Sequence, residues 1–305
     1  MMQLKESPFV EDLPVVQGRY SFGYLMSKAT WFKVGGPCEI FFKPANTDDL
    51  CYFLKNKPSN LKVMCIGAGS NILVRDGGID SCIVKLGSGF SEISIEDDIV
   101  IAGAGCLNRT LVMRCQEAGL SGLEFLVGIP GTIGGALAMN AGAYDNETKD
   151  FLEWFEFVDP QGNLHRLHSH EIHMTYRHGN LPMDSIAVRA AFRCIKKDPL
   201  EIKMKVNAYL QKREESQPIR GRTGGSTFKN PAQGPKAWEL IDQAGCRGLR
   251  IGDAQVSEKH CNFLLNLDAA QASDIETLGM MVQQKVKEIT GQELEWEIIR
   301  LGSPL

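Results

Sequence analysis

The sequence has neither an excess of basic residues nor a long apolar run. Its 33 Lys and Arg residues are outnumbered by 37 Asp and Glu residues, and the net charge is −4, so the basic surface that a nucleic-acid partner requires is missing. No uninterrupted apolar run approaches the roughly 20 residues of a membrane-spanning helix. The opening segment MMQLKESPFVEDLP lacks the continuous apolar core of a signal peptide. We therefore expect a cytoplasmic protein, without membrane insertion or nucleic acid, that acts on a small molecule.

Cysteine pairs and metal-ligand arrays are also missing. The nine cysteines are an odd number and include no Cys-x-x-Cys pair, so neither a disulfide framework nor a zinc knuckle is indicated. Most of these cysteines are expected to be buried. Five of the six histidines fall between His165 and His178. Imidazole is a common metal ligand, but no cysteine or carboxylate array accompanies these histidines, and we predict no metal site.

The 305 residues are enough for two or three domains with buried cores. Apolar alternation around an Asp-Asp turn predicts a hairpin at 90–104, and a Pro-x-Gly turn predicts another at 151–168. Both helices and strands recur, which indicates an α/β or α+β fold, with a domain boundary near residue 196. Further strands are predicted at 38–45, 62–67, 79–86, 185–195, 263–267 and 293–301, and helices at 47–58, 108–119, 199–217 and from 236.

Two of the predicted helices carry more specific expectations. The helix at 47–58 is expected to begin with Thr47 as its cap. A long helix precedes the final strand and is expected to form a crossover between neighbouring strands. Its apolar residues at helical spacing are Ile275, Leu278, Val282, Val286 and Ile289.

Glycine is concentrated in three places. GAGSN at 67–71 and GAG at 103–105 each follow a predicted strand, and GIPGTIGGALAMNAGAY at 128–144 is the richest stretch. Glycine after a strand permits positive φ and lets backbone amides approach a ligand such as a pyrophosphate. A single Gly-x-Gly is most often only a tight turn. Three such segments in one chain favour a phosphate cradle.

Two well-known nucleotide cradles do not fit this sequence. GAGSNILVRDGG departs from Gly-x-Gly-x-x-Gly at the last glycine, and the residues after it look extended, with no helix to direct its amino end at phosphate. No Gly-Lys-Ser or Gly-Lys-Thr occurs, which excludes a Walker loop. A different nucleotide-binding fold is therefore expected.

Five motifs in order then identify a resemblance. GAGSNILVRDGG, GLEFLVGIPGTIGGALAMNAGAY, TYR at 175–177, GSTFKNP at 225–231 and LEWEIIRLG at 294–302 resemble the UDP-N-acetylenolpyruvoylglucosamine reductase (UDP-N-acetylmuramate dehydrogenase) family of peptidoglycan-precursor flavoenzymes. The resemblance implies an α+β chain with an FAD-binding fold of the p-cresol methylhydroxylase/vanillyl-alcohol oxidase type and an α+β substrate-binding domain. The implied parts are an N-terminal extension (1–20), FAD-binding subdomains at 21–86 and 87–196, and a C-terminal domain (197–305).

The sequence departs from the family pattern at two positions and in one loop. Gly179 stands where the family usually has a serine, and Asp145 stands where glycine is common. The stretch between Arg177 and Ser226 is too compact for the tyrosine-bearing loop of one branch of the family. The chain therefore resembles the shorter type, which lacks that loop.

The resemblance also implies the cofactors and the residues around them. FAD is expected to bind non-covalently, because GAGSN contains no histidine or cysteine for a flavin link, and NADPH is the expected co-substrate. The implied cofactor-binding residues are Gly67, Ala68, Gly69, Ser70, Asn71, Gly103, Gly128, Ile129, Pro130, Gly131, Thr132, Gly134, Gly135, Asn140 and Gly142.

The implied reaction is the NADPH-dependent reduction of UDP-N-acetylglucosamine enolpyruvate to UDP-N-acetylmuramate. Hydride added to the vinyl β-carbon makes an enolate, which needs cationic or hydrogen-bonding groups at its carboxylate and a proton donor at its α-carbon. By resemblance, Ser226 is the proton donor, Arg177 binds the carboxylate and Glu297 assists its polarisation. The implied substrate-binding residues are Tyr176, Lys229 and Asn230.

Two other functions remain open from the sequence. An FAD-dependent alcohol oxidase of the same fold would reduce oxygen and would need no NADPH. A flavin-binding module without catalysis would hold FAD that neither NADPH nor substrate alters.

Overall fold

The computed structural model describes residues 9–305, so the predicted N-terminal extension lies outside the described residues as far as residue 8. The described chain forms two compact units. The first comprises residues 9–23, Glu39–Ala68 and Ser81–Lys212, and the second comprises Tyr24–Cys38, Gly69–Asp80 and Arg213–Leu305. Each unit has its own hydrophobic core, and the first unit has two.

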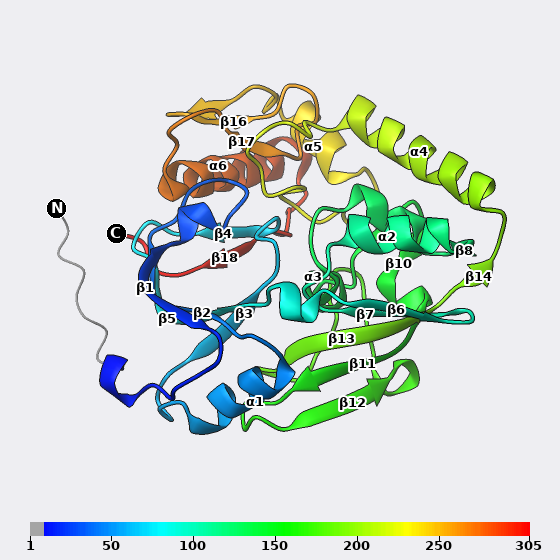
Figure 1. The fold of residues 1–305 in the computed structure, drawn as a ribbon. Coiled ribbons are helices and arrows are strands. Elements are labelled where there is room, and N and C mark those ends of the chain that lie inside the picture. Colours follow the sequence, from blue (N-terminus) through cyan, green and yellow to red (C-terminus); the bar gives the residue numbers. More distant parts are fainter. Residues whose placement is uncertain (1–8) are drawn as a thin grey trace. The chain divides into compact units, whose positions relative to one another are not determined.

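A four-stranded sheet contains the strand that leads into the first glycine segment. Its order is β1 (Arg19–Leu25), β2 (Pro37–Lys43), β5 (Ile79–Lys85) and β3 (Val63–Ile66), with β3 and β5 parallel. Helix α1 (Thr47–Asn56) packs on it through Leu50, Phe53 and Leu54, as Figure 1 shows. The three predicted strands and the helix are confirmed, but the predicted cap is wrong. Asn46 accepts the hydrogen bond from the amide of Asp49, and Thr47 is already helical.

The second sheet of the first unit is antiparallel and five-stranded. Its order is β12 (Leu164–His168), β11 (Leu152–Val158), β13 (Ile186–Arg193), β7 (Ile99–Gly103) and β6 (Ile93–Glu96). Both predicted hairpins are confirmed as the β6/β7 and β11/β12 pairs. Helices α2 (Asn108–Glu117) and α3 (Ile133–Ala138) share a core with this sheet. The glycine-rich stretch 128–144 is therefore anchored on a packed sheet.

Shorter elements and one long helix complete the first unit. The long helix α4 (Pro199–Ser216) starts in the first unit, where Ile202 and Val206 are buried, and continues into the second at Arg213. The short strands are β8 (Leu120–Ser121), β9 (Gly142–Ala143), β10 (Asn146–Glu147) and β14 (Ile195–Lys196), and the 3-10 helices are η1 (Val10–Asp12), η3 (Ser88–Phe90), η4 (Glu124–Gly128), η5 (Thr148–Asp150) and η6 (Ser169–Glu171).

The second unit is built on one long helix. Helix α6 (Ala272–Thr290) packs with α5 (Ala237–Gln243) and the antiparallel sheet β15 (Arg250–Ile251), β16 (Ala254–Val256) and β17 (Leu264–Asn266). A second, parallel sheet joins β18 (Ile299–Leu301) to β4 (Ile72–Val74). The turn η2 (Met26–Lys28) also belongs to this unit.

Two expectations for the long helix are wrong. Helix α6 does not connect neighbouring strands, because β17 and β18 lie in different sheets. Ile289 is 62% exposed, because it stands next to the last helical residue, whereas the other four residues of the apolar stripe are fully buried.

Two general findings concern residues 9–305. In this part of the chain, no helix is both long enough and apolar enough to cross a membrane. All nine cysteines are free thiols and seven are buried, which confirms the expectation that most of them are core residues.

The packing of Trp296 against α6 leaves no room for a side chain at Gly279. A Cβ atom at Gly279 would lie 2.1 Å from Cη2 of Trp296. Two contacts fix the indole. Its Nε1 donates to Gln283 Oε1 at 2.7 Å, and the Arg300 guanidinium lies 4.6 Å from the ring centroid. The ring cannot move aside without losing these contacts.

We predict that Gly279→Ala lowers the free energy of unfolding by about 1–3 kcal/mol, because overpacking a core outweighs the better helix propensity of alanine. Urea unfolding followed by tryptophan fluorescence measures the change. The matched control is Met280→Ala, at a position that is 49% exposed in the same helix. An unchanged stability in Gly279→Ala would show that Trp296 is free to repack.

Candidate cofactor and active site

Two glycine segments that are far apart in the sequence meet in the first unit. Gly67 directly follows β3, and Thr132 is the N-cap of α3, where its Oγ1 accepts a hydrogen bond from the Gly135 amide at 3.3 Å. A Cβ atom at Gly67 would lie 2.8 Å from that same Oγ1. Glycine at position 67 is therefore required for the close approach of these segments.

Gly135 differs from Gly67 in its surroundings. A Cβ atom there would meet only Thr132 Oγ1, at an ordinary contact distance of 3.6 Å. Among residues 9–305, no other atom outside the helix backbone lies within 4 Å of this Cβ position, whereas Gly134 packs against Ala104, whose carbonyl accepts its amide at 2.8 Å. The backbone at Gly135 thus has no side chain and has open space beside it, which fits a ligand that is bound by main-chain groups.

Several other glycines implied as cofactor contacts have a packing role. Gly103 and Gly142 lie so close to other backbone that a Cβ atom would be 2.1 Å from Phe90 O and 2.7 Å from Asn146 O, respectively. Gly69 and Gly131 have positive φ angles of 73° and 151°. Of the remaining residues, Ala68, Ser70, Ile129 and Pro130 are half-buried, and Gly128 is buried at the end of η4.

Asn140 holds the end of the glycine stretch through its side chain. It is fully buried, and its Nδ2 donates to Glu147 Oε2 and to the Thr175 carbonyl, both at 3.0 Å. Its Oδ1 accepts the Lys149 amide at 3.0 Å. Both polar atoms of Asn140 are therefore bonded within the protein, and the residue links the glycine stretch to the segment that carries Tyr176 and Arg177.

Arg177 stands at the tip of a tight turn. The amides and carbonyls of Thr175 and His178 exchange hydrogen bonds of 2.9 and 3.0 Å, and Arg177 has a φ of 58°. Its guanidinium lies 4.7 Å from the Tyr176 ring centroid. A cation–π contact of this kind orients the side chain.

A steric contact explains one of the two residues that depart from the family pattern, Gly179. A Cβ atom at Gly179 would lie 1.9 Å from the Leu137 carbonyl oxygen, so this loop has no room for the serine usual in the family. Asp145 is exposed and has a φ of 62°, a backbone conformation that glycine adopts with less strain.

A buried carboxylate supports the helix that leads into the glycine stretch. Glu124 is 2% exposed, and it accepts hydrogen bonds from Ser121 Oγ at 2.6 Å and from the Gly122 amide at 2.9 Å. The Lys205 ammonium of α4 lies 3.2 Å away. Burial alone would raise the pKa of Glu124, but the hydrogen bonds and the ammonium lower it below its ordinary value. The sequence analysis did not single out this residue.

Ser226 and Glu297 come together in the second unit. The segment at 226–229 lies antiparallel to 295–298, because the Glu297 amide donates to the Thr227 carbonyl and the Lys229 amide donates to the Glu295 carbonyl, both at 2.8 Å. Ser226 is half-buried next to Gly225, whose φ is 81°. The two residues implied as catalytic in this unit thus stand on paired segments.

A buried asparagine fixes the other side of the Ser226 segment. Asn262 is 4% exposed. Its Oδ1 accepts the Phe228 amide at 3.0 Å, and its Nδ2 donates to the Phe228 carbonyl at 2.8 Å. The Thr227 amide donates to the Asn262 carbonyl at 2.8 Å. The segment 257–263, which contains Asn262, therefore holds the backbone that follows Ser226 in place.

The last residue of GAGSN joins the Glu297 segment. Asn71 Nδ2 donates to the Glu297 carbonyl at 3.1 Å, and the Asn71 carbonyl accepts the Ile299 amide at 3.0 Å. Of the implied substrate-binding residues, Lys229 forms an exposed ion pair with Glu295 at 3.4 Å, and Asn230 accepts the Ala237 amide at the start of α5. Asn71 and Asn230 thus have structural roles in the second unit.

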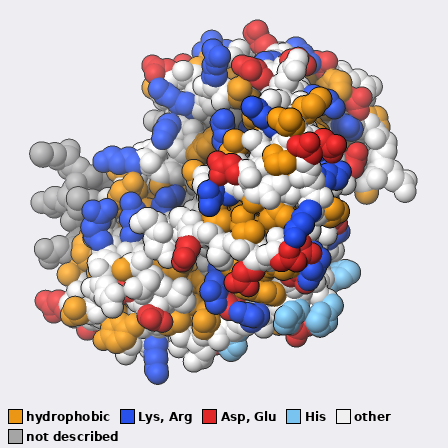
Figure 2. Space-filling model, turned by 45° about the vertical axis from the view of Figure 1, so that its right-hand side comes forward, with side chains coloured by type: hydrophobic (Ala, Val, Ile, Leu, Met, Phe, Trp, Pro, Cys, Tyr) orange, Lys and Arg blue, Asp and Glu red, His pale blue; other side chains and the backbone are white. Residues whose placement is uncertain are grey.

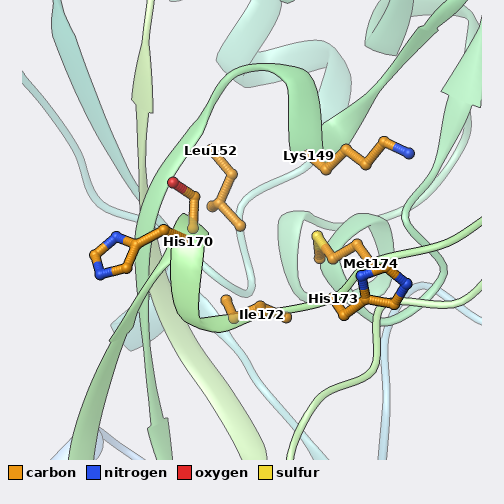
Figure 3. A pocket seen from close by; sticks show the side chains of 7 residues that line it. Lys149, Leu152, His170, Ile172, His173 and Met174 are labelled. Carbon is orange, nitrogen blue, oxygen red and sulfur yellow. The ribbon is translucent and has the colours of Figure 1, made fainter.

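A hollow in the first unit is lined by none of the implied site residues. It has a volume of about 310 Å³ and is lined by Lys149, Leu152, Ser169, His170, Ile172, His173 and Met174, with His170 and His173 on opposite sides in Figure 3. The histidine-rich segment forms an exposed surface cluster, which is pale blue in Figure 2. In residues 9–305 no three His, Cys, Asp or Glu side chains are grouped to hold a metal ion.

Comparison with known proteins identifies the family. Residues 38–168 match the FAD binding domain, and residues 217–301 match the C-terminal domain of UDP-N-acetylenolpyruvoylglucosamine reductase. A reductase of that name from Acidiphilium cryptum is 50% identical over 96% of this chain and 94% of its own length, and one from Rickettsia felis is 51% identical over 95% and 98%. The chain belongs to the UDP-N-acetylenolpyruvoylglucosamine reductase family.

A solved structure agrees with this assignment. The reductase from Thermus caldophilus is 32% identical, has a TM-score of 0.81 and covers 94% of this chain and 100% of its own. The predicted family and the predicted α+β fold, with an FAD-binding part followed by a family-specific C-terminal domain, are thus confirmed. The protein is an FAD-containing oxidoreductase.

We predict that Glu124→Gln lowers the free energy of unfolding at pH 7 by about 1–3 kcal/mol, since it removes a hydrogen-bonded buried charge. The folded-state pKa of Glu124 is lowered, so its stabilisation is present above its ordinary pKa and is lost as the pH falls through the folded value. The difference between wild type and variant should therefore shrink at pH 4 and below.

Urea unfolding at pH 7, 4 and 3.5 tests this, with Glu117→Gln as control. Glu117 forms an exposed ion pair with Arg114, and its loss should change stability by less than about 1 kcal/mol. A pH-independent difference in Glu124→Gln would contradict a charged role for Glu124.

Proposed function

We propose that the chain catalyses the NADPH-dependent reduction of UDP-N-acetylglucosamine enolpyruvate to UDP-N-acetylmuramate, a step of peptidoglycan precursor synthesis. The observation that carries the proposal is the pairing of the Ser226 and Glu297 segments in a chain about half identical to reductases of that name. The proposed division places FAD-binding subdomains at 21–86 and 87–196 and a substrate-binding domain at 197–305.

The residues of the first unit fit an FAD cofactor. Gly67 and Gly135 are half-buried glycines, and the space beside Gly135 is open, so that a side chain there would hold a flat or anionic ligand away. These residues would hold the cofactor by main-chain groups, and GAGSN offers no side chain for a covalent flavin link. When bound, FAD supplies the chemistry that accepts a hydride from NADPH and delivers it to the substrate.

The chain's own residues complete the reaction. Hydride addition to the vinyl β-carbon places negative charge on the enolate, and Arg177 is proposed to bind the carboxylate from which that charge is delocalised. Ser226 then donates its hydroxyl proton to the α-carbon. Glu297 is proposed to assist the polarisation of the carboxylate. The backbone of its segment is hydrogen-bonded to the segment that carries Ser226. Tyr176 and Lys229 are proposed to contact the substrate.

An anaerobic visible spectrum tests the function directly. The purified protein receives NADPH and then the enolpyruvyl form of UDP-N-acetylglucosamine. Loss of the flavin absorbance on the first addition and its return on the second would support the proposal. A flavin that ignores NADPH, and that air reoxidises after an alcohol reduces it, would replace the proposal with the alcohol oxidase. A flavin that neither reagent alters would indicate a binding module.

We predict that Ser226→Ala reduces turnover by about 10²- to 10⁴-fold, the contribution expected of a positioned proton donor. Stopped-flow absorbance should show that NADPH still bleaches the flavin at the wild-type rate, because the hydroxyl is not needed in that half-reaction. Ser273→Ala, at the exposed start of α6, serves as control. Wild-type turnover in Ser226→Ala would exclude Ser226 as the donor.

A further inference from the structure

A lysine outside every glycine motif reaches the glycine segment. Lys85 is the last residue of β5 and pairs with Ile66 in the parallel β3/β5 register. Its Nζ donates to the carbonyl oxygen of Gly67 at 2.6 Å. An ammonium has three donors, and within residues 9–305 this is the one hydrogen bond that Lys85 Nζ makes.

Within residues 9–305, the charge of Lys85 has no carboxylate counterion. The side chain is half-buried, burial lowers the pKa of its ammonium, and nearby Lys43 lowers it further, while the Cys65 thiol has the opposite effect. No carboxylate in the described chain pairs with it, whereas in the second unit Glu276 binds both Arg75 and Arg300. A partly desolvated cation without a partner is unfavourable, so an anion from outside the chain would stabilise it.

The ammonium stands beside the bare backbone of the glycine segments. Its acceptor, Gly67, is the residue that abuts Thr132 Oγ1, and the backbone nitrogen of Gly135 lies 3.9 Å from the Cβ position of Gly67. Open space lies beside Gly135. Exposed main chain together with a cation of this kind is a typical arrangement for phosphate binding.

We propose that Lys85 binds the pyrophosphate of FAD, with Nζ donating to a non-bridging phosphate oxygen while it keeps its bond to the Gly67 carbonyl. This inference rests on the FAD binding included in the proposed function. The glycine motifs alone predict a cradle made of main-chain groups, and Lys85 would add a charged side-chain contact to it. The lysine would thus be costly in the free protein and favourable in the complex.

Lys85→Met tests the proposal, since it keeps the length of the side chain and removes the charge. The full chain is freed of flavin and titrated with FAD, and flavin fluorescence gives the dissociation constant. We expect an increase of about 10- to 100-fold, which corresponds to the loss of one charge-assisted hydrogen bond. Lys85→Arg should restore most of the affinity, because it keeps a cationic donor.

A second measurement separates ligand binding from a structural role. The melting temperature of flavin-free Lys85→Met should equal or exceed that of the wild type, since an unpaired charge has been removed, whereas a lysine that merely holds Gly67 would lower it. Lys62→Met is the matched control, because Lys62 is an exposed lysine just before β3. Wild-type FAD affinity in Lys85→Met, or a lowered flavin-free melting temperature, would overturn the proposal.

The outcome is independent of the reaction proposed above. A wild-type protein that binds FAD but whose flavin does not respond to NADPH would refute the proposed reaction and leave the comparison of Lys85→Met with wild type intact. A wild-type protein that does not bind FAD would overturn both proposals.

Discussion

The close approach of Gly67 to the Thr132 hydroxyl determines the geometry of the proposed cofactor cradle. The hydroxyl also caps α3 through the Gly135 amide, so any side chain at position 67 would displace the cap as well as the backbone. The same short helix is held from its other side, where the Gly134 amide bonds to the Ala104 carbonyl after β7. The three glycine segments are therefore in contact with one another: Gly67 is bare because of Thr132, and Gly134 packs tightly against Ala104, whereas Gly103 is bare because of Phe90.

Two buried asparagines hold the segments that carry the proposed catalytic residues in place. Asn140 ties the end of the glycine stretch to the carbonyl of Thr175, just before Tyr176 and Arg177. Asn262 binds both backbone groups of Phe228, two residues after Ser226. A carboxamide can satisfy a donor and an acceptor at once, so each residue adds support to a segment whose backbone pairing is limited to isolated bridges. These asparagines position the functional loops and leave the chemistry to other side chains.

The sequence predicted local elements well because their signals are local. Both antiparallel hairpins follow from alternation around turn residues, and the apolar stripe of α6 follows from helical spacing. The pairing of β18 with β4 could not be read in the same way, because parallel strands far apart in the chain carry no shared turn. For the site, the glycine motifs led to the proposed position of the cofactor, but they could not show which glycines serve packing, as Gly103 and Gly142 do. Glu124 and Lys85 were missed because their roles depend on contacts distant in sequence.

Charge is balanced differently for the acidic and basic groups that the fold partly buries. Asp49 accepts three backbone amides, and Glu156 is bound by Arg166 and Arg189. Glu124 is satisfied by Ser121, Gly122 and Lys205, as described above. Lys85 donates to the Gly67 carbonyl and pairs with no carboxylate of residues 9–305. The partly buried anions are thus neutralised, but this cation is not. The free protein is therefore less stable than it would be if the charge of Lys85 were also paired. Under the proposed binding of FAD by Lys85, ligand binding would recover that stability in proportion to the logarithm of ligand concentration over the dissociation constant, and cofactor occupancy and folding stability would be coupled through this ammonium.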